Sequence, residues 1–302
     1  MADERIERHP HRYAWRKRFA DAKPVMRGEG GSVHSAEGEG AWWLITDEGT
    51  MADFLDDEDL GGLVKLRRFD DFHSWNQAII AYRDARARLH VEESLRTAVP
   101  AIASYVEACA AERTLVRINE RDHLQPWSFK ALKLVLRPSD GPLAVGASMR
   151  LDYPEHWPRL GNVDITLTAE GAAPAFVELK CGAGSDALGP CVWDVAKNAL
   201  TLRMGDASAA YLLAATTTAM WDKPVRGAEL FDHGEWTTER LRSDYMDWWR
   251  QFERPPYCYR PKRLPVRGYT DPLASAAFRV GDTDWDLRLS RVTVKTHGWF
   301  DW

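Results

Sequence analysis

The chain has 302 residues, of which 45% are hydrophobic and 11% aromatic, enough for one large domain or two. No segment approaches ~20 uninterrupted apolar residues, and the first residues lack the apolar stretch of a signal peptide, so the sequence predicts a cytoplasmic protein with no membrane span. The net charge of −5 argues against a sequence-independent nucleic-acid binder, and the four cysteines, which lack metal-type pairing, are expected to be reduced thiols.

Residues 1–92 are expected to form an N-terminal extension. Residues 28–40 are rich in glycine and predict little regular structure, residues 42–45 resemble a strand, and residues 72–89 show helical spacing. Acidic residues gather at 53–59 and basic residues at 12–18, where tyrosine and tryptophan lie among them.

A helix is expected over residues 93–113, because apolar residues recur there every three or four positions. Pro100 lies inside this stretch and either kinks the helix or marks its true start. Residues 128–136 are the alternative first helix of the core; they are closer to the next strand but contain no acidic residue.

Two neighbouring strands are predicted to carry acidic and basic side chains. Residues 143–153 read as a strand that ends at breakers in 154–161, after which Asp164 lies in a short apolar run. Glu178-Leu179-Lys180 closes the next run, 14 residues after Asp164, which leaves room for a turn around residues 170–171. Since side chains alternate along a strand, Glu178 and Lys180 share a face, and a hairpin would bring Asp164 to them.

After a glycine-rich turn, residues 192–204 have helical spacing and residues 209–218 form a nearly continuous apolar run, as expected of a buried strand. Residues 93–220 are therefore the predicted core. Residues 221–302 are predicted to be a C-terminal extension packed on it, with a strand, an amphipathic helix over 238–252, a proline-rich basic loop and short strands. The 14 tryptophans are expected to serve mainly in this packing.

The Asp164…Glu178-Leu179-Lys180 pattern, in this order of elements, resembles the PD-(D/E)xK nuclease superfamily. The proline of the motif is absent, and Asn162-Val163 precede Asp164 instead. The resemblance implies an α/β restriction-endonuclease-like core, with a central mixed sheet flanked by helices and with N- and C-terminal extensions.

The resemblance also implies a chemistry. Asp164, Glu178 and the Leu179 carbonyl would bind Mg²⁺ or Mn²⁺, and Lys180 would orient or deprotonate the attacking water in phosphodiester hydrolysis of nucleic acid, with DNA as the favoured substrate. Glu107 would be an accessory metal ligand, and Lys197 would reach back toward Lys180. The enzyme would be a nuclease of the restriction, defence or repair type.

Several alternatives stay open. Glu-x-Lys occurs by chance as a solvated ion pair, Asp194 and Lys197 are spaced for a simple helical ion pair, and a catalytically idle member of the fold would bind nucleic acid or a protein partner instead. A homodimer is also open. The basic stretch 254–267, with Tyr257 and Tyr259, fits either phosphate contact or a loop lying over the domain surface. Its candidate phosphate-binding residues are Arg260, Lys262, Arg263 and Arg267.

Overall fold

A computed structural model describes residues 21–28, 31–38, 40–47, 58–59, 64–136, 143–169, 173–223, 226–295 and 298–301. The chain divides into two compact units, Met1–Ala87 and Arg88–Trp302. Helix α3 (Phe72–Glu112) runs through the boundary, so the 93–113 helix predicted from the sequence is the second part of a longer one. Pro100 lies inside α3 with an exposed side chain and does not mark its start.

The first unit contains an antiparallel sheet in the order β1-β2-β3-β5-β4. Its strands are β1 (Lys23–Gly28), β2 (Gly31–Gly38), β3 (Ala41–Asp47), β4 (Glu58–Asp59) and β5 (Val64–Phe69). The prediction of little regular structure over 28–40 was wrong, because β2 pairs with both β1 and β3 there. The strand over 42–45 is confirmed. The basic stretch 12–18 and most of the acidic stretch 53–59 lie outside the described residues.

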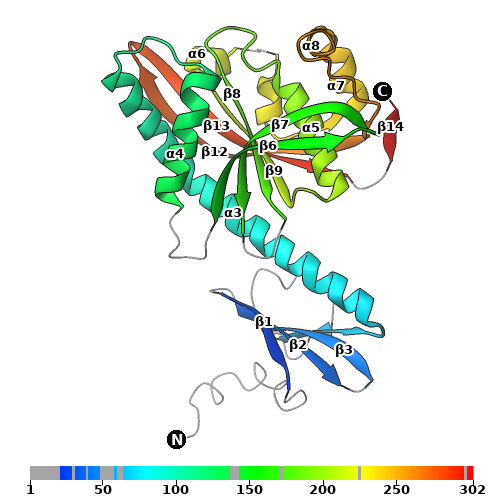
Figure 1. Ribbon diagram of the computed structural model, residues 1–302. Helices are drawn as coiled ribbons and strands as arrows, with labels where there is room; N and C mark the ends of the chain where they lie inside the picture. The colour runs from blue at the N-terminus through cyan, green and yellow to red at the C-terminus, as the bar shows by residue number, and fades with distance from the viewer. Residues whose placement is uncertain are drawn as a thin grey trace, which may run out of the picture. The chain divides into compact units, whose positions relative to one another are not determined.

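The second unit is built on a seven-stranded mixed sheet in the order β10-β12-β13-β9-β8-β7-β6 (Figure 1). The strands are β6 (Ala144–Tyr153), β7 (Trp157–Thr168), β8 (Ala175–Cys181), β9 (Ala209–Thr217), β10 (Gly234–Thr237), β12 (Arg267–Val280) and β13 (Thr283–Val294). The short strands β11 (Arg263–Pro265) and β14 (Trp299–Asp301) pair separately. Of the described pairs in the large sheet, β8 with β9 is the parallel one, and α5 (Cys191–Met204) connects them.

The remaining helices lie before β6 and around β10. They are the π-helical turn η2 (Glu120–Leu124), α4 (Gln125–Val135), α6 (Thr218–Trp221), the 3₁₀ turn η4 (Ala228–Phe231), α7 (Thr238–Asp244) and α8 (Met246–Phe252). No helix in the described part of the chain is long and apolar enough to cross a membrane. The four cysteines form no disulfide.

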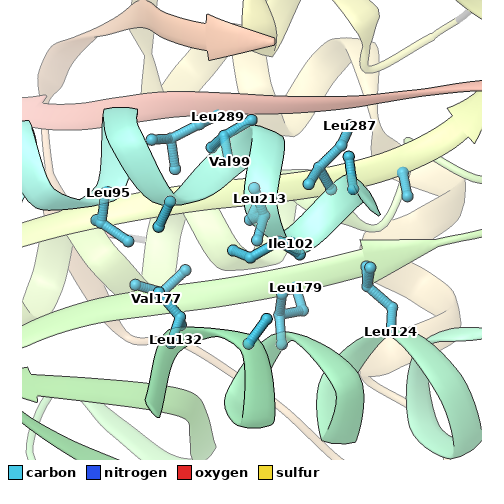
Figure 2. Close-up of a cluster of buried hydrophobic side chains, with 14 of the residues drawn as sticks. Leu95, Val99, Ile102, Leu124, Leu132, Val177, Leu179, Leu213, Leu287 and Leu289 are labelled. Carbon is cyan, nitrogen blue, oxygen red and sulfur yellow. The ribbon is translucent and has the colours of Figure 1, made fainter. Parts of the chain in front are cut away.

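Two buried clusters cover the two faces of the large sheet. In the first, α3 and α4 pack on odd-numbered residues of β8 and β9. Figure 2 shows part of this cluster, including Leu95, Val99, Ile102, Leu132, Val177, Leu179 and Leu213. In the second, α5, α7 and α8 pack on even-numbered residues such as Phe176 and Leu212. Burial of the apolar side chains thus fixes which face of the sheet each residue of β8 and β9 points to.

The predicted core order of strand, strand with Asp164, strand with Glu178, helix and buried strand is present as β6, β7, β8, α5 and β9. Residues 157–161, expected to be breakers, instead begin β7. Residues 221–302 are not an appendage to the sheet, because β10, β12 and β13 continue it beyond β9. The turn expected around residues 170–171 lies outside the described residues.

Candidate active site

Strand alternation places the Glu178-Leu179-Lys180 segment as the sequence predicted. The side chain of Leu179 is fully buried in the cluster beneath α3 and α4. Glu178 and Lys180 instead reach residues of α5 on the opposite face. The Leu179 side chain thereby anchors this end of β8, while its two charged neighbours are held together on the other side.

Asp164 lies where β7 and β8 part. The last backbone pair between these strands is Ile165 with Val177, and beyond it the Leu179 N–H donates to Oδ2 of Asp164 at 2.8 Å. Gln125, at the start of α4, donates to the other oxygen at 3.2 Å. The Asp164 carboxylate therefore takes the place of a ladder hydrogen bond and lies directly against the segment that carries Glu178 and Lys180.

Lys180 has three oxygen neighbours, one hydrogen-bonded carbonyl and two carboxylates in ion pairs. Its Nζ lies 2.7 Å from the carbonyl oxygen of its neighbour Leu179, 2.9 Å from Oδ2 of Asp194 and 3.4 Å from Oε2 of Glu120. The Lys180 side chain is 17% exposed. It thus joins β8 to α5 and to the turn η2.

Lys197, on α5, likewise has one hydrogen-bonded carbonyl and two carboxylates in ion pairs. Its Nζ lies 2.9 Å from Oε1 of Glu178, 2.9 Å from the Asn162 carbonyl and 3.5 Å from Oδ1 of Asp194. The helical ion pair with Asp194 considered from the sequence is present, but Lys197 is closer to Glu178. Four carboxylates (Glu120, Asp164, Glu178 and Asp194) and two ammonium groups thus share one site.

Burial and neighbouring charges shift the pKa values of the ionisable groups in this site. Burial, together with Asp194 and Asp164, raises the pKa of Glu178 well above its ordinary value, although Lys197 opposes the shift. The pKa of Glu120 is raised mainly by burial. The nearby carboxylates overcome burial at both lysines, so the pKa of Lys180 and that of Lys197 are raised and both ammonium groups stay charged at neutral pH.

Glu120 is a site residue that the sequence did not single out. It opens η2 directly after Asn119, whose side chain caps the turn by accepting from the Asp122 N–H. The asparagine cap was the available signal, but it does not reveal which strand the turn approaches. Among the described residues, no hydrogen bond or ion pair joins Glu107, the accessory acid expected on α3, to the charged group.

A cluster of aromatic side chains lies next to the site, on the side of α8. Tyr259 packs against Trp157, Trp193 and Phe252, so its ring serves packing. Its hydroxyl lies close to Gly161, where an added Cβ would come within 2.8 Å of the oxygen. Gly161 has φ +89° and directly precedes Asn162, so glycine is required where the chain presents its carbonyl to Lys197.

The four candidate phosphate-binding residues are all exposed but differ in pairing. Arg263 lies 3.1 Å from Asp301, and Arg267 lies 3.8 Å from Glu235. Within the described ranges, Arg260 and Lys262 have no acidic partner. Part of the expected loop is strand, since Arg263 begins β11 and Arg267 begins β12.

The donor set is compatible with a hard divalent cation. Asp164, Glu178 and the Leu179 carbonyl supply the oxygen ligands that Mg²⁺ prefers, and with all groups ionised the site has two negative charges in excess. Across the described residues, no three histidine, cysteine, aspartate or glutamate side chains converge to hold a metal. An ion here would therefore depend on two carboxylates, one carbonyl and water.

Comparisons with protein-family models, with curated proteins and with solved structures found no match to this chain.

Proposed function

We propose that this protein is a metal-dependent nuclease that hydrolyses phosphodiester bonds of nucleic acid, with DNA as the favoured substrate. The observation that best supports the proposal is the hydrogen bond from the Leu179 N–H to the Asp164 carboxylate. It places Asp164 beside Glu178 and Lys180, where strands β7 and β8 separate. A solvated Glu-x-Lys pair does not explain it, since the Glu178 side chain is 1% exposed. Burial of several ionisable groups around one point is typical of a functional site.

The arrangement of elements supports a restriction-endonuclease-like core as part of this proposal. Strands β6, β7 and β8 form an antiparallel meander, and α5 then crosses to β9, which is parallel to β8. The acids lie on the second and third of these strands. This is the order that the resemblance to the PD-(D/E)xK superfamily implies.

Asp164, Glu178 and the Leu179 carbonyl would hold Mg²⁺ or Mn²⁺, which when bound supplies a Lewis acid for the phosphate and a water of lowered pKa. The Leu179 carbonyl is also an acceptor for Lys180. If that carbonyl turns to the cation, Lys180 gains a free N–H donor, which can hold the attacking water or a phosphate oxygen. Gln125 would keep the Asp164 carboxylate oriented.

The test is incubation of the purified protein with duplex DNA, single-stranded DNA and RNA, each with Mg²⁺, with Mn²⁺ and with EDTA. The proposal predicts cleavage of at least one substrate with a divalent ion and none with EDTA. Cleavage that persists in EDTA, or no cleavage of any substrate, would reject it. The Lys180→Ala variant should retain the metal and lose about 10²–10⁴-fold in rate.

A second candidate is a catalytically idle protein of this fold that binds nucleic acid or a protein partner. One observation favours it: two of the oxygens needed for a cation already contact lysines of the protein. Lys197 contacts Glu178, and Lys180 donates to the Leu179 carbonyl. Binding of nucleic acid that is unaffected by divalent ions and is not followed by cleavage would support this candidate.

A further inference from the structure

Asp194 has a buried carboxylate whose two oxygens contact two different lysines. Its side chain is 5% exposed, with Oδ2 2.9 Å from Lys180 and Oδ1 3.5 Å from Lys197. Among the described residues, it is the carboxylate that contacts both. Burying a charged carboxylate is unfavourable unless it is paired with opposite charge. The two lysines therefore stabilise Asp194, and Asp194 in turn restrains the lysines.

The two lysines are held against different strands. Lys180 donates to the Leu179 carbonyl on β8, and Lys197 donates to the Asn162 carbonyl on β7. These strands part beyond the Ile165–Val177 pair. From α5, Asp194 thus contacts both the lysine held on β8 and the lysine held on β7.

Charge requires a group in this position. The two ammonium groups repel each other, and each lies within 3.5 Å of a different oxygen of the Asp194 carboxylate. Without Asp194, Lys180 would keep Glu120, whose side chain is 34% exposed, and Lys197 would keep Glu178. Each lysine would then depend on a carboxylate that is more exposed or is needed for the cation.

We propose that Asp194 is a positioning residue that fixes the ammonium groups of Lys180 and Lys197 in place, Lys180 beside the Leu179 carbonyl and Lys197 beside Glu178. The role of Asp194 in catalysis rests on the proposed nuclease function. Its restraint of the two lysines does not, which allows separate tests.

The first test measures the lysines and needs no activity. Full-length metal-free protein is labelled with trace acetic anhydride, and acylation of each lysine is quantified by mass spectrometry in wild type, Asp194→Asn and Asp194→Glu. Acylation of Lys180 and Lys197 should rise about tenfold in Asp194→Asn, because each loses a nearby opposite charge, and should fall back in Asp194→Glu. Exposed Lys262 is the internal reference. Unchanged acylation of both lysines in folded Asp194→Asn overturns the proposal.

The second test separates positioning from metal binding. At saturating Mn²⁺, single-turnover cleavage by Asp194→Asn should be about 10–100-fold slower, with partial recovery in Asp194→Glu. The Mn²⁺ dissociation constant, measured by electron paramagnetic resonance, should change less than in Asp164→Asn. Asp282→Asn, an exposed change in the turn between β12 and β13, is the matched control.

An unchanged rate in Asp194→Asn, or a decrease in Mn²⁺ affinity as large as that in Asp164→Asn, overturns the positioning role. If wild type does not cleave any substrate, the nuclease proposal fails, and the acylation result still decides whether Asp194 restrains the lysines.

Discussion

The ammonium group of Lys180 has two carboxylate partners of unequal exposure, Asp194 at 5% and Glu120 at 34%. Under the proposed function, a substrate phosphate that approaches Lys180 would have to replace Glu120, the more accessible partner, and would be repelled by the charge of Glu120. We therefore expect Glu120→Gln to bind nucleic acid more tightly, by about fivefold, which corresponds to the ~1 kcal/mol of a partly exposed ion pair. Fluorescence anisotropy with EDTA present measures this binding without cleavage.

Glu107→Gln is the matched control, because among the described residues Glu107 has no hydrogen bond or ion pair with the charged group. It should leave nucleic-acid affinity unchanged. Weaker Mn²⁺ binding by Glu120→Gln would show that Glu120 is a metal ligand instead. Weaker Mn²⁺ binding by Glu107→Gln would restore the accessory role that the resemblance implies.

Glu178 makes the stability of the metal-free protein depend on pH. Burial raises its folded-state pKa above the ordinary value of 4.5, so folding favours the protonated form. This contribution to stability is fully present below about pH 4.5 and is lost as the pH rises through the folded-state pKa. Glu178→Gln cannot ionise, so its Tm should rise relative to wild type between pH 4.5 and 8. Thermal melts across this range, with exposed Glu155→Gln as control, test it; a Tm difference independent of pH would contradict it.

At the scale of elements, the first half of β7 depends on Gly161. An alanine there must adopt φ near +89° and bring its Cβ within 2.8 Å of the Tyr259 hydroxyl. We expect Gly161→Ala to lower the free energy of unfolding by about 1–2 kcal/mol, since non-glycine residues are strained at positive φ. Urea unfolding of Gly161→Ala with and without Tyr259→Phe separates the two causes. Part of the destabilisation should remain in the Tyr259→Phe background. If Gly161→Ala caused no loss of stability in that background, the positive φ at residue 161 would contribute nothing.

The elements that sequence predicted correctly are those whose apolar pattern is local. Strand β8, helix α5 and strand β9 have clear patterns and were found within a residue or two. The strands after the basic loop were expected to be short, because Pro272 and several alanines weaken the pattern of β12, which spans 14 residues. Pro272 is accommodated by a register shift beyond the end of β10, where the strand is unpaired on that side. The helix expected over 238–252 is broken at Tyr245, whose ring is buried and whose hydroxyl bonds to Glu229.

The site shows the same division between local and long-range information. Strand alternation predicted that Glu178 and Lys180 share a face, and a hairpin predicted their approach to Asp164. Glu120 could not be found, because only the three-dimensional path of η2 brings it to β8. Glu120 and Asp194, together with Lys197, which the resemblance had suggested, join Asp164, Glu178 and Lys180, so the proposed cation site is closely confined by the protein's own charges.

At the scale of the whole molecule, a chain of net charge −5 must present its positive charge locally to bind nucleic acid. Within the part of the chain that the structure describes, Arg260 and Lys262 are exposed without acidic partners, whereas Arg263 and Arg267 face Asp301 and Glu235. We expect glutamine substitution of the first pair to weaken nucleic-acid binding. The slope of log K against log salt should fall by about one for each phosphate that the variant no longer neutralises.

The second pair, substituted in the same way, is the comparison. Its effect should be smaller, because each arginine is already partly neutralised. Binding isotherms at several salt concentrations measure both variants. Equal affinity and slope in wild type and the Arg260/Lys262 variant would mean that nucleic acid approaches by another surface.

The proposed function requires that metal-dependent cleavage depend on the charge of Asp164 and Glu178, and single-turnover cleavage by wild type and Asp164→Asn at saturating Mg²⁺ is the decisive experiment. The substitution keeps the shape of the side chain and removes its charge. We expect wild type to cleave, cleavage to fall at least about 10²–10³-fold in Asp164→Asn, and the variant to stay folded. Cleavage at the wild-type rate in folded Asp164→Asn would show that this carboxylate has no part in the reaction and that the proposed site is wrong.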